Sequence, residues 1–320
     1  MQDNLGDFDV PAPGQMVPLL MRDGAEIRLR RYGDSTGLRL VLSHGNGLAI
    51  NSYAPFWLSL TDQFDVIVFD VRNHGENPRH APDRHRMDVI VADFEEIFQA
   101  IQTHFGPAPT IGVFHSLSAI ASLQHTMQHG PRWAALALFD PPIYPKDGHP
   151  LQPDHNADMA DLVQRSHRRP RRYDRPEEFA KQLARRPAFA RLVPQGAMLL
   201  ARHTLRQEMD GSWGLCNPRE LEARIYQAQN DATLWPRMRE LTIPVILICG
   251  DPAVPETSPA TRVGAAIHDD IGIEYVVIPD TTHFLQIERP QACRDALKSF
   301  LHTHGLVDSQ PLASRGQAAQ

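Results

Sequence analysis

Cysteine is scarce in this sequence, and its spacing excludes two kinds of stabilised scaffold. Cys216, Cys249 and Cys293 are the cysteines among the 320 residues, and no two of them form a CxxC pair. An odd number of widely spaced cysteines fits neither a disulfide framework nor the thiolate cluster of a structural zinc site. We therefore expect free, buried thiols, and the chemistry discussed below calls for no metal and no cofactor.

A basic excess and a long apolar run are also missing. The chain carries 32 Lys and Arg against 38 Asp and Glu, a formal net charge of −6, whereas general binding to nucleic acid or anionic membrane needs a basic surface. Residues 1–14 are polar and acidic, and no uninterrupted apolar run approaches the length that spans a bilayer. We expect a cytoplasmic protein that acts on a small molecule.

The chain alternates between short apolar or β-branched runs and helical stretches. With 42% hydrophobic and 22% charged residues it has the composition of a globular protein. Eight runs are typical of strands, the first two forming a hairpin: 16–21, 26–32, 38–43, 64–70, 110–115, 133–140, 244–250 and 273–279. This alternation predicts an α/β fold with a mostly parallel eight-stranded sheet flanked by helices.

The segment 141–240 interrupts that alternation. It is rich in Arg, Pro and Gln and has no clear strand run, so we interpret it as a helical cap inserted after the sixth strand. The core would then comprise residues 1–140 and 241–304, and the small polar residues 305–320 would form a disordered tail. We expect the cap to cover an active site.

A candidate nucleophile lies where the fifth strand runs into a helix. The junction reads Phe114-His115-Ser116-Leu117-Ser118. At such a turn the serine hydroxyl is held clear of the sheet, while the next backbone N–H faces a developing oxyanion. The pattern departs from G-x-S-x-G, because Phe114 and Ser118 occupy the two glycine positions. The alternative is that Ser116 only caps the helix, since serine is a preferred N-cap residue.

Three other segments follow strand ends along the chain. His44-Gly45-Asn46-Gly47 follows the strand 38–43, and the segment 70–75, which we interpret as structural, follows the next strand. His283 lies after the last strand and before the final helix. Taken in this order, the four segments resemble the α/β-hydrolase family, and the resemblance covers residues 38–301 apart from the cap.

The resemblance implies an α/β-hydrolase fold and a role for each segment. Ser116 would be the nucleophile and His283 its general base, which fits the family order of nucleophile, acid, histidine. The backbone N–H groups of Asn46 and Leu117 would form the oxyanion hole, with Gly47 as an alternative donor. For the isolated tetrapeptide 44–47, a simple Asn-Gly turn is the competing interpretation.

Two aspartates could complete the triad by holding the histidine tautomer. The usual family acid follows the seventh strand by a few residues, where this chain has Ala253, and Asp251 lies too close to the strand. Asp140 ends the sixth strand, a position from which some branches of the family supply the acid. We favour Asp140 and keep Asp251 as the alternative; Asp140 could instead only cap the hinge of the insertion.

These residues predict a serine hydrolase that cleaves a carboxylic ester or thioester through an acyl-enzyme. Twelve Lys and Arg against three acids between 165 and 206 either pair with acids elsewhere or attract an anionic substrate such as an acyl-CoA. The alternatives are a non-hydrolytic or carbon-carbon bond cleaving enzyme on the same fold, and a ligand-binding protein with a degenerate site. The sequence does not indicate the oligomeric state.

Overall fold

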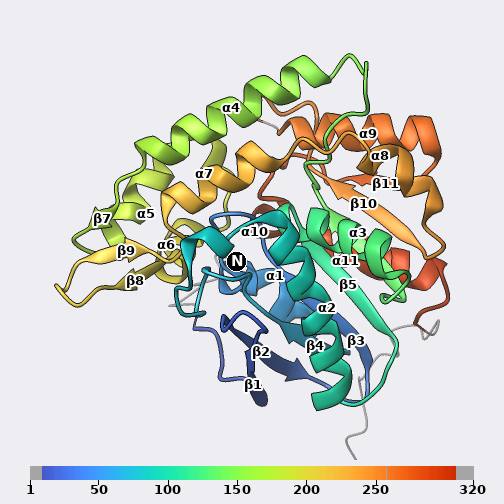
Figure 1. Ribbon diagram of the computed structural model, residues 1–320, viewed down its shortest axis with the longest axis horizontal. Helices are drawn as coiled ribbons and strands as arrows, with labels where there is room; N and C mark the ends of the chain where they lie inside the picture. Colours follow the sequence, from blue (N-terminus) through green and yellow to red (C-terminus); the bar gives the residue numbers. More distant parts are fainter. Residues whose placement is uncertain (1–8, 257, 308–320) are drawn as a thin grey trace, which may run out of the picture.

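An eight-stranded sheet lies at the centre of the computed structural model, which describes residues 9–256 and 258–307 (Figure 1). The strand order is β1-β2-β4-β3-β5-β6-β10-β11. β1 and β2 form an antiparallel hairpin, β2 is antiparallel to β4, and the remaining neighbours are parallel. The strands are β1 (Gln15–Leu20), β2 (Glu26–Gly33), β3 (Leu38–Ser43), β4 (Phe64–Val68), β5 (Thr110–His115), β6 (Ala135–Phe139), β10 (Val245–Cys249) and β11 (Glu274–Val277). The predicted fold class is confirmed, and each predicted run overlaps one of these strands.

The central strands are apolar on both faces, as expected for a parallel sheet covered on two sides. In β10, Val245, Leu247 and Cys249 join one hydrophobic cluster, while Ile246 and Ile248 join the other. Because successive side chains of a strand point to opposite faces, each central strand contributes to two separate cores.

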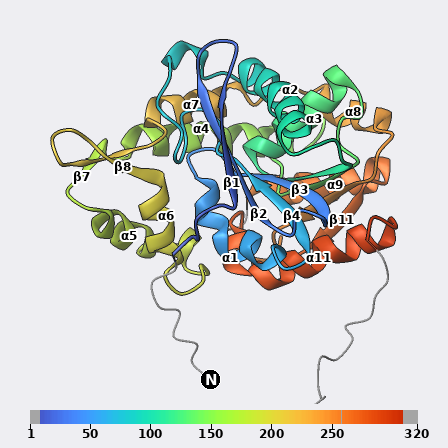
Figure 2. The same ribbon diagram turned by 90° about the horizontal axis from the view of Figure 1, so that it is seen from below.

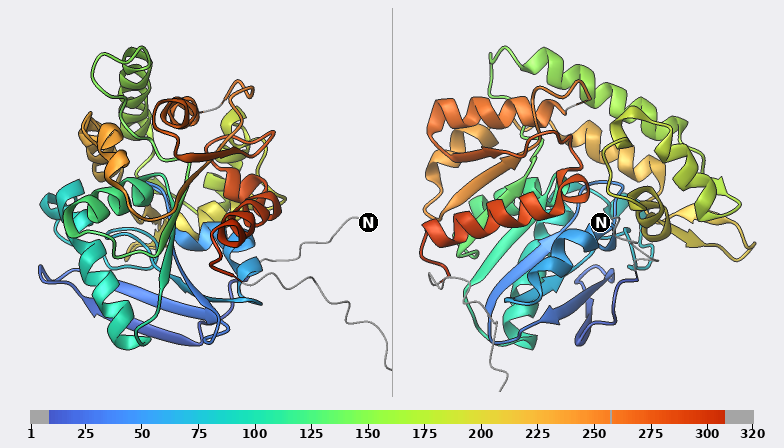
Figure 3. Two further views of the ribbon diagram at one scale, coloured as in Figure 1. Left: turned by 90° about the vertical axis from the view of Figure 1, so that its right-hand side faces the viewer. Right: turned by 180° about the vertical axis from the view of Figure 1, so that it is seen from behind.

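Helices cover both faces of the sheet (Figures 2 and 3). One core contains side chains of α2 (Met87–His104), α3 (Leu117–His129), α8 (Leu234–Arg237) and α9 (Pro259–Ile271). The other contains side chains of α1 (Ala54–Trp57), α10 (Leu285–Glu288) and α11 (Pro290–Thr303). Short 3-10 helices connect these elements: η1 (Ile50–Tyr53), η2 (Leu58–Leu60), η3 (Pro82–Arg84), η4 (Pro187–Phe189) and η5 (Met238–Glu240).

The segment between β6 and α8 is not wholly helical. It contains α4 (Gln152–Arg168), α5 (Pro176–Ala184), α6 (Gly196–Thr204) and α7 (Arg219–Ala228). It also contains an antiparallel sheet in the order β7-β9-β8, made of β7 (Arg172–Tyr173), β8 (Leu205–Gln207) and β9 (Trp213–Leu215). The expectation that this segment has no strands is therefore corrected. Strands of two or three residues are too short to show an alternating pattern.

The insertion lies along one edge of the core, with α4 packed against α7 and α6 against η1 (Figure 1). The division into a core (1–140 and 241–304) and an insertion (141–240) stays a prediction, and residues 308–320 of the predicted tail lie outside the described residues. In the described part of the chain, none of the helices has both the length and the apolar character that a membrane crossing requires.

Candidate active site

Ser116 occupies a strained turn between β5 and α3. Its backbone has φ 53° and ψ −113°, in a region that non-glycine residues rarely adopt. Its N–H donates to the Phe139 carbonyl at 3.0 Å, which ties the turn to the end of β6. Within the described residues, the Ser116 hydroxyl makes no capping bond to α3, so the geometry does not match that of a helix N-cap.

The two departures from the glycine pattern each have a structural explanation. Phe114 is fully buried beneath the turn, its ring 5.2 Å from the rings of both Phe94 and Trp133. Gly112 makes room for it, because a Cβ there would lie 2.4 Å from the Phe114 ring. Ser118 closes the turn itself: its hydroxyl accepts from the His115 N–H at 3.0 Å and donates to the His115 carbonyl at 2.9 Å.

Three of the predicted site residues form one hydrogen-bonded chain. His283 Nε2 lies 3.1 Å from Ser116 Oγ, and His283 Nδ1 lies 2.6 Å from Asp140 Oδ2. With its proton on Nδ1, the imidazole donates to the carboxylate and leaves Nε2 free to accept the serine hydroxyl proton. These distances are those expected of a nucleophile, a base and an orienting acid.

Asp140 is fully buried at the end of β6, with φ 41°. Its second oxygen, Oδ1, accepts from Thr261 Oγ1 at 2.9 Å and from the Gly250 N–H at 3.4 Å. Because both oxygens have donors, the carboxylate is held in one orientation.

Asp251 lies elsewhere, and its carboxylate faces backbone rather than imidazole. Its oxygens accept from the Ala253 N–H at 2.8 Å and from the Asp280 N–H at 2.9 Å. These backbone bonds, the Asp280 N–H first, lower the pKa of Asp251. The residue therefore joins the loop after β10 to the loop before His283, and the structure does not bring it to the imidazole.

The loop that carries His283 is held by a buried carboxylate. Glu288, in α10, accepts from the Thr282 N–H at 2.6 Å and from the Thr282 hydroxyl at 2.7 Å. Burial raises the pKa of Glu288, and its bonds to Thr282 oppose that rise. The sequence analysis did not single out Glu288, because its partner is defined by the fold of the loop.

His115 connects three parts of the site. Its Nε2 lies 2.9 Å from the His283 carbonyl and its Nδ1 lies 2.7 Å from the Tyr53 hydroxyl, which in turn accepts from the Gly45 N–H at 3.2 Å. Burial lowers the pKa of His115 well below its ordinary value, and nearby His283 lowers it further. A neutral His115 that donates from Nε2 and accepts at Nδ1 satisfies all three contacts.

The predicted oxyanion loop lies directly against the turn. A Cβ on Gly45 would lie 3.0 Å from the Ser116 Cβ, so only glycine fits at this close approach. Leu117 is the first residue of α3, and its N–H therefore has no acceptor within the helix. The Gly47 N–H, the alternative donor, donates to His74 Nε2 at 3.1 Å.

α7 of the insertion lies over this loop. Glu222 is buried, and a Cβ on Gly47 would lie 2.7 Å from its carboxyl carbon. Arg169 pairs with both carboxylate oxygens of Glu222, at 2.8 and 3.1 Å. Burial raises the pKa of Glu222, and the Arg169 charge opposes that rise. A buried carboxylate paired with a partly buried arginine thus lies beside the candidate oxyanion hole.

Several arginines of the basic segment pair with acids. Arg171 contacts Glu220 and Arg172 contacts Glu208, each at 2.8 Å. Arg191 lies 3.0 Å from Glu256 and 3.1 Å from Asp280. This pairing is the first of the two explanations that the sequence allowed, and it reduces the local excess of positive charge.

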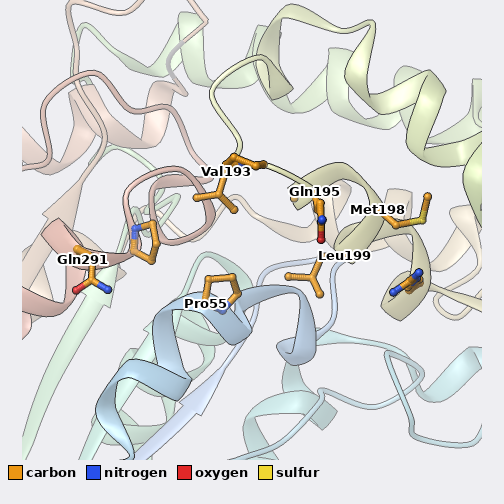
Figure 4. Close-up of a pocket in the computed structure, with 10 residues that line it drawn as sticks. Pro55, Val193, Gln195, Met198, Leu199 and Gln291 are labelled. Carbon is orange, nitrogen blue, oxygen red and sulfur yellow. The ribbon is translucent and has the colours of Figure 1, made fainter. Parts of the chain in front are cut away.

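A separate pocket of about 270 Å³ lies at the seam between the insertion and the core (Figure 4). It gathers Val193, Met198 and Leu199 from the insertion, and Pro55 and Gln291 from α1 and α11. Ser116, His283 and Asp140 are not among its lining residues. It is therefore distinct from the hydrogen-bonded chain described above.

Comparisons with known proteins agree with this architecture. Residues 40–296 match the model of the alpha/beta hydrolase family. No curated protein sequence matches the chain. Among solved structures, E-2-(acetamidomethylene)succinate hydrolase is similar with a TM-score of 0.73 and 17% identity, over 90% of this chain and 100% of that one.

Two further solved structures have the same fold. A thioesterase domain from the curacin biosynthetic pathway has a TM-score of 0.69 and 15% identity, over 89% of this chain and 99% of that one. A thermophilic esterase from Thermogutta terrifontis has a TM-score of 0.64 and 20% identity, over 90% of this chain and 98% of that one. At these identities the similarity establishes the fold and leaves the substrate open.

Proposed function

The chain belongs to the alpha/beta hydrolase family, and we propose that it is a serine hydrolase that cleaves a carboxylic ester or thioester through an acyl-enzyme. The observation that carries the proposal is the continuous chain from Ser116 Oγ through His283 to Asp140, with distances of 3.1 and 2.6 Å. A binding protein with a degenerate site would not need to keep the hydroxyl, the imidazole and the carboxylate within hydrogen-bonding distance of one another. Serine at the turn also disfavours the alkyl-enzyme chemistry that an aspartate nucleophile supports.

In the first half of the proposed reaction, Ser116 Oγ attacks the substrate carbonyl carbon while His283 Nε2 takes the hydroxyl proton. The carbonyl oxygen becomes an oxyanion that accepts from the backbone N–H groups of Asn46 and Leu117. Asp140 stabilises the imidazolium by accepting from Nδ1. When the intermediate collapses, the carbon-oxygen or carbon-sulfur bond breaks, and the leaving alcohol or thiol takes the proton from Nε2.

In the second half, water replaces the leaving group. His283 removes a proton from water as it attacks the acyl-enzyme carbonyl, the same oxyanion hole is used again, and Ser116 regains its proton as the carboxylic acid departs. The overall reaction consumes one water and yields one acid and one alcohol or thiol. The residues of this chain supply each proton transfer.

The test is turnover of p-nitrophenyl acyl esters and acyl-CoA thioesters by wild type and three variants. Ser116→Ala should lose on the order of 10⁴-fold or more in kcat, and Asp140→Asn about 10⁴-fold, because the amide supports the wrong histidine tautomer. Asp251→Asn is the matched control and should stay within about threefold of wild type, because its carboxylate faces only backbone N–H groups.

Two outcomes would contradict the proposal. Full activity in Ser116→Ala would mean that the hydrolysis does not proceed through an acyl-enzyme on Ser116. No turnover of any ester or thioester by wild type, together with no labelling of Ser116 by a fluorophosphonate, would favour a binding protein. If Asp251→Asn, and not Asp140→Asn, abolished turnover, the assignment of the acid would be wrong.

A further inference from the structure

The loop 45–47 is held from two sides, by the core and by the insertion. On the core side, the Gly45 N–H donates to the Tyr53 hydroxyl at 3.2 Å and the Gly47 N–H donates to His74 Nε2 at 3.1 Å. These two bonds fix the residues on either side of Asn46. The Gly45 carbonyl, which belongs to the same peptide group as the Asn46 N–H, accepts from the Leu48 N–H at 3.2 Å and lies 2.8 Å from His44 Nδ1. The core therefore holds the carbonyl end of this peptide group, and the Cα of Asn46 is its other end.

The side chain of Asn46 makes its contacts with the insertion. Its Nδ2 donates to the Glu222 carbonyl at 2.9 Å, and its Oδ1 accepts from Asn217 Nδ2 at 3.4 Å. The Tyr226 hydroxyl lies beside this amide, and its pKa is raised chiefly by burial. Asn46 is itself only 6% exposed, so its amide is held in a closed polar site formed by residues 217–226.

The insertion presents a fixed surface to Asn46. The Glu222 carboxylate is clamped by Arg169, and the Arg169 carbonyl accepts from Arg219 Nη1 at 2.6 Å. A Cβ on Gly47 would clash with the Glu222 carboxylate at 2.7 Å, so the loop and α7 are in direct contact. A shift of α7 would therefore move the Asn46 side chain while the two flanking N–H groups stayed bound to the core.

We propose that Asn46 is a positioning residue, whose side chain is held by α7 so that its own backbone N–H points at the oxyanion. The inference rests on the proposed serine hydrolase function. The core holds the Gly45 end of the peptide group and the insertion holds the Asn46 end, so that both set the direction of the N–H. Asn217 and Tyr226 contact the side-chain amide of Asn46. They therefore affect the reaction only through the position of Asn46.

The experiment compares Asn46→Ala and Tyr226→Phe with a matched asparagine variant, Asn77→Ala. Asn77 is fully buried in a loop after a strand, and its Nδ2 donates to the carbonyls of Asp70 and Val71 at 2.7 and 3.3 Å. Those bonds lie within the core. For each protein, kcat and KM are measured on the best ester, together with the inhibition constant of a trifluoromethyl ketone with the same acyl group, which forms an oxyanionic adduct with serine.

In Asn46→Ala we expect kcat to fall by about 30- to 300-fold with KM within about threefold, because a misplaced donor affects the transition state and hardly the ground state. The inhibition constant of the ketone should rise by the same factor as kcat falls. Tyr226→Phe, which keeps the ring and removes the hydroxyl beside the Asn46 amide, should show the same pattern at about 3- to 10-fold. Asn77→Ala should lower the thermal midpoint with an unchanged ratio of inhibition constant to KM.

Asn46→Ala that keeps the wild-type ratio of inhibition constant to KM, whatever its stability, would overturn the inference. The same holds if Tyr226→Phe equals wild type in both kcat and ketone affinity. Neither result would affect the proposed function, which fails separately if the wild type shows no turnover and no labelling of Ser116.

Discussion

Asp140 is a fully buried carboxylate whose two oxygens have separate tasks. Oδ2 faces the imidazole, while Oδ1 is held by Thr261 and by the Gly250 N–H. Thr261 lies in α9, on the far side of the insertion in sequence, and it touches no reacting atom. Its hydroxyl acts on the imidazole only by fixing the plane of the carboxylate.

Thr261→Val tests this arrangement with a side chain of nearly the same shape. The variant removes a hydrogen bond to a buried charged group, an interaction of about 1.5–3 kcal/mol. We expect kcat to fall by about 5- to 50-fold with KM little changed. Steady-state kinetics on the best ester measure both constants.

Thr126→Val is the matched control, because Thr126 is also buried and its hydroxyl donates within α3 to the Ser122 carbonyl at 2.8 Å. It should leave kcat within about twofold of wild type. Equal kcat values for the two variants would show that Thr261 does not orient the acid.

Ser116 and His283 could be selected from the sequence because each stands at a strand end with a distinctive local pattern. The choice between Asp140 and Asp251 could not be made in the same way, since both follow a strand directly. It depends on whether the carboxylate faces imidazole or backbone N–H groups. Thr261 left no local signal at all, because its partner is 121 residues away along the chain.

At the scale of elements, the turn between β5 and α3 rests on a large aromatic side chain where glycine is usual. Phe114 packs among the rings of Phe69, Phe94 and Trp133, in the core that contains side chains of α2, α3, α8 and α9. Gly112, two residues earlier on the same face of β5, supplies the space. The small residue that makes room at this turn is therefore at position 112 instead of 114.

Restoring the usual motif by Phe114→Gly should therefore destabilise the protein. The loss of a buried phenyl ring costs about 3–5 kcal/mol, and glycine within a strand adds up to about 1 kcal/mol. Urea unfolding should show a clearly lower midpoint. Phe98→Ala is the control, because Phe98 packs against the same Trp133 while only partly buried, and its cost should be smaller. A Phe114→Gly variant as stable as wild type would refute the packing argument.

The eight main strands and the helix after Ser116 could be predicted because each is long enough to show its apolar period. β7, β8 and β9 could not, because they are two or three residues long and form only by pairing with one another. The seating of α7 on the loop 45–47 was equally hidden, since it depends on tertiary contacts such as that between Asn46 and Glu222.

At the scale of the whole molecule, burial changes the protonation of several histidines among the described residues. Burial is the chief cause that lowers the pKa in each of seven histidines: His44, His74, His85, His115, His125, His155 and His203. Their pKa lies below about 6.5 in the folded protein and near about 6.5 in the unfolded chain. Acidification therefore protonates the unfolded chain first.

We expect the free energy of unfolding to fall as the pH drops from 7 to 5.5, by at most about 1.4 kcal/mol per pH unit for each histidine. Burial shifts the pKa of Asp93 in the opposite direction, raising it to about 6. Asp93 therefore increases the free energy of unfolding as the pH falls over the same range. It offsets one histidine of the seven, and the raised pKa values of Asp158, Glu222 and Glu288 act in the same direction as that of Asp93. Urea titrations at several pH values measure the slope, and a free energy that stays constant or rises on acidification would contradict the expectation.

His155→Phe isolates one member of the group. Both ring nitrogens of His155 are buried without a hydrogen-bond partner among the described residues, and burial lowers its pKa to about 4. An apolar ring of similar size should reduce the pH slope between about 5 and 6 by about 1.4 kcal/mol per pH unit. An unchanged slope would mean that His155 is not neutral in the folded state.

The hydrogen bond between Asp140 and His283 joins residues 143 positions apart, and the whole insertion lies between them. As the chain leaves the ribosome, the serine, its turn and the loop 44–47 emerge early, whereas β10, which pairs with β6 beside Asp140, comes about a hundred residues later. A nascent chain therefore contains Ser116, the proposed nucleophile, long before it contains His283, the proposed base. Hydrolytic activity would be the last property that the protein acquires during synthesis. The rate at which this activity returns on refolding would measure how fast the final strands pair with the rest of the sheet.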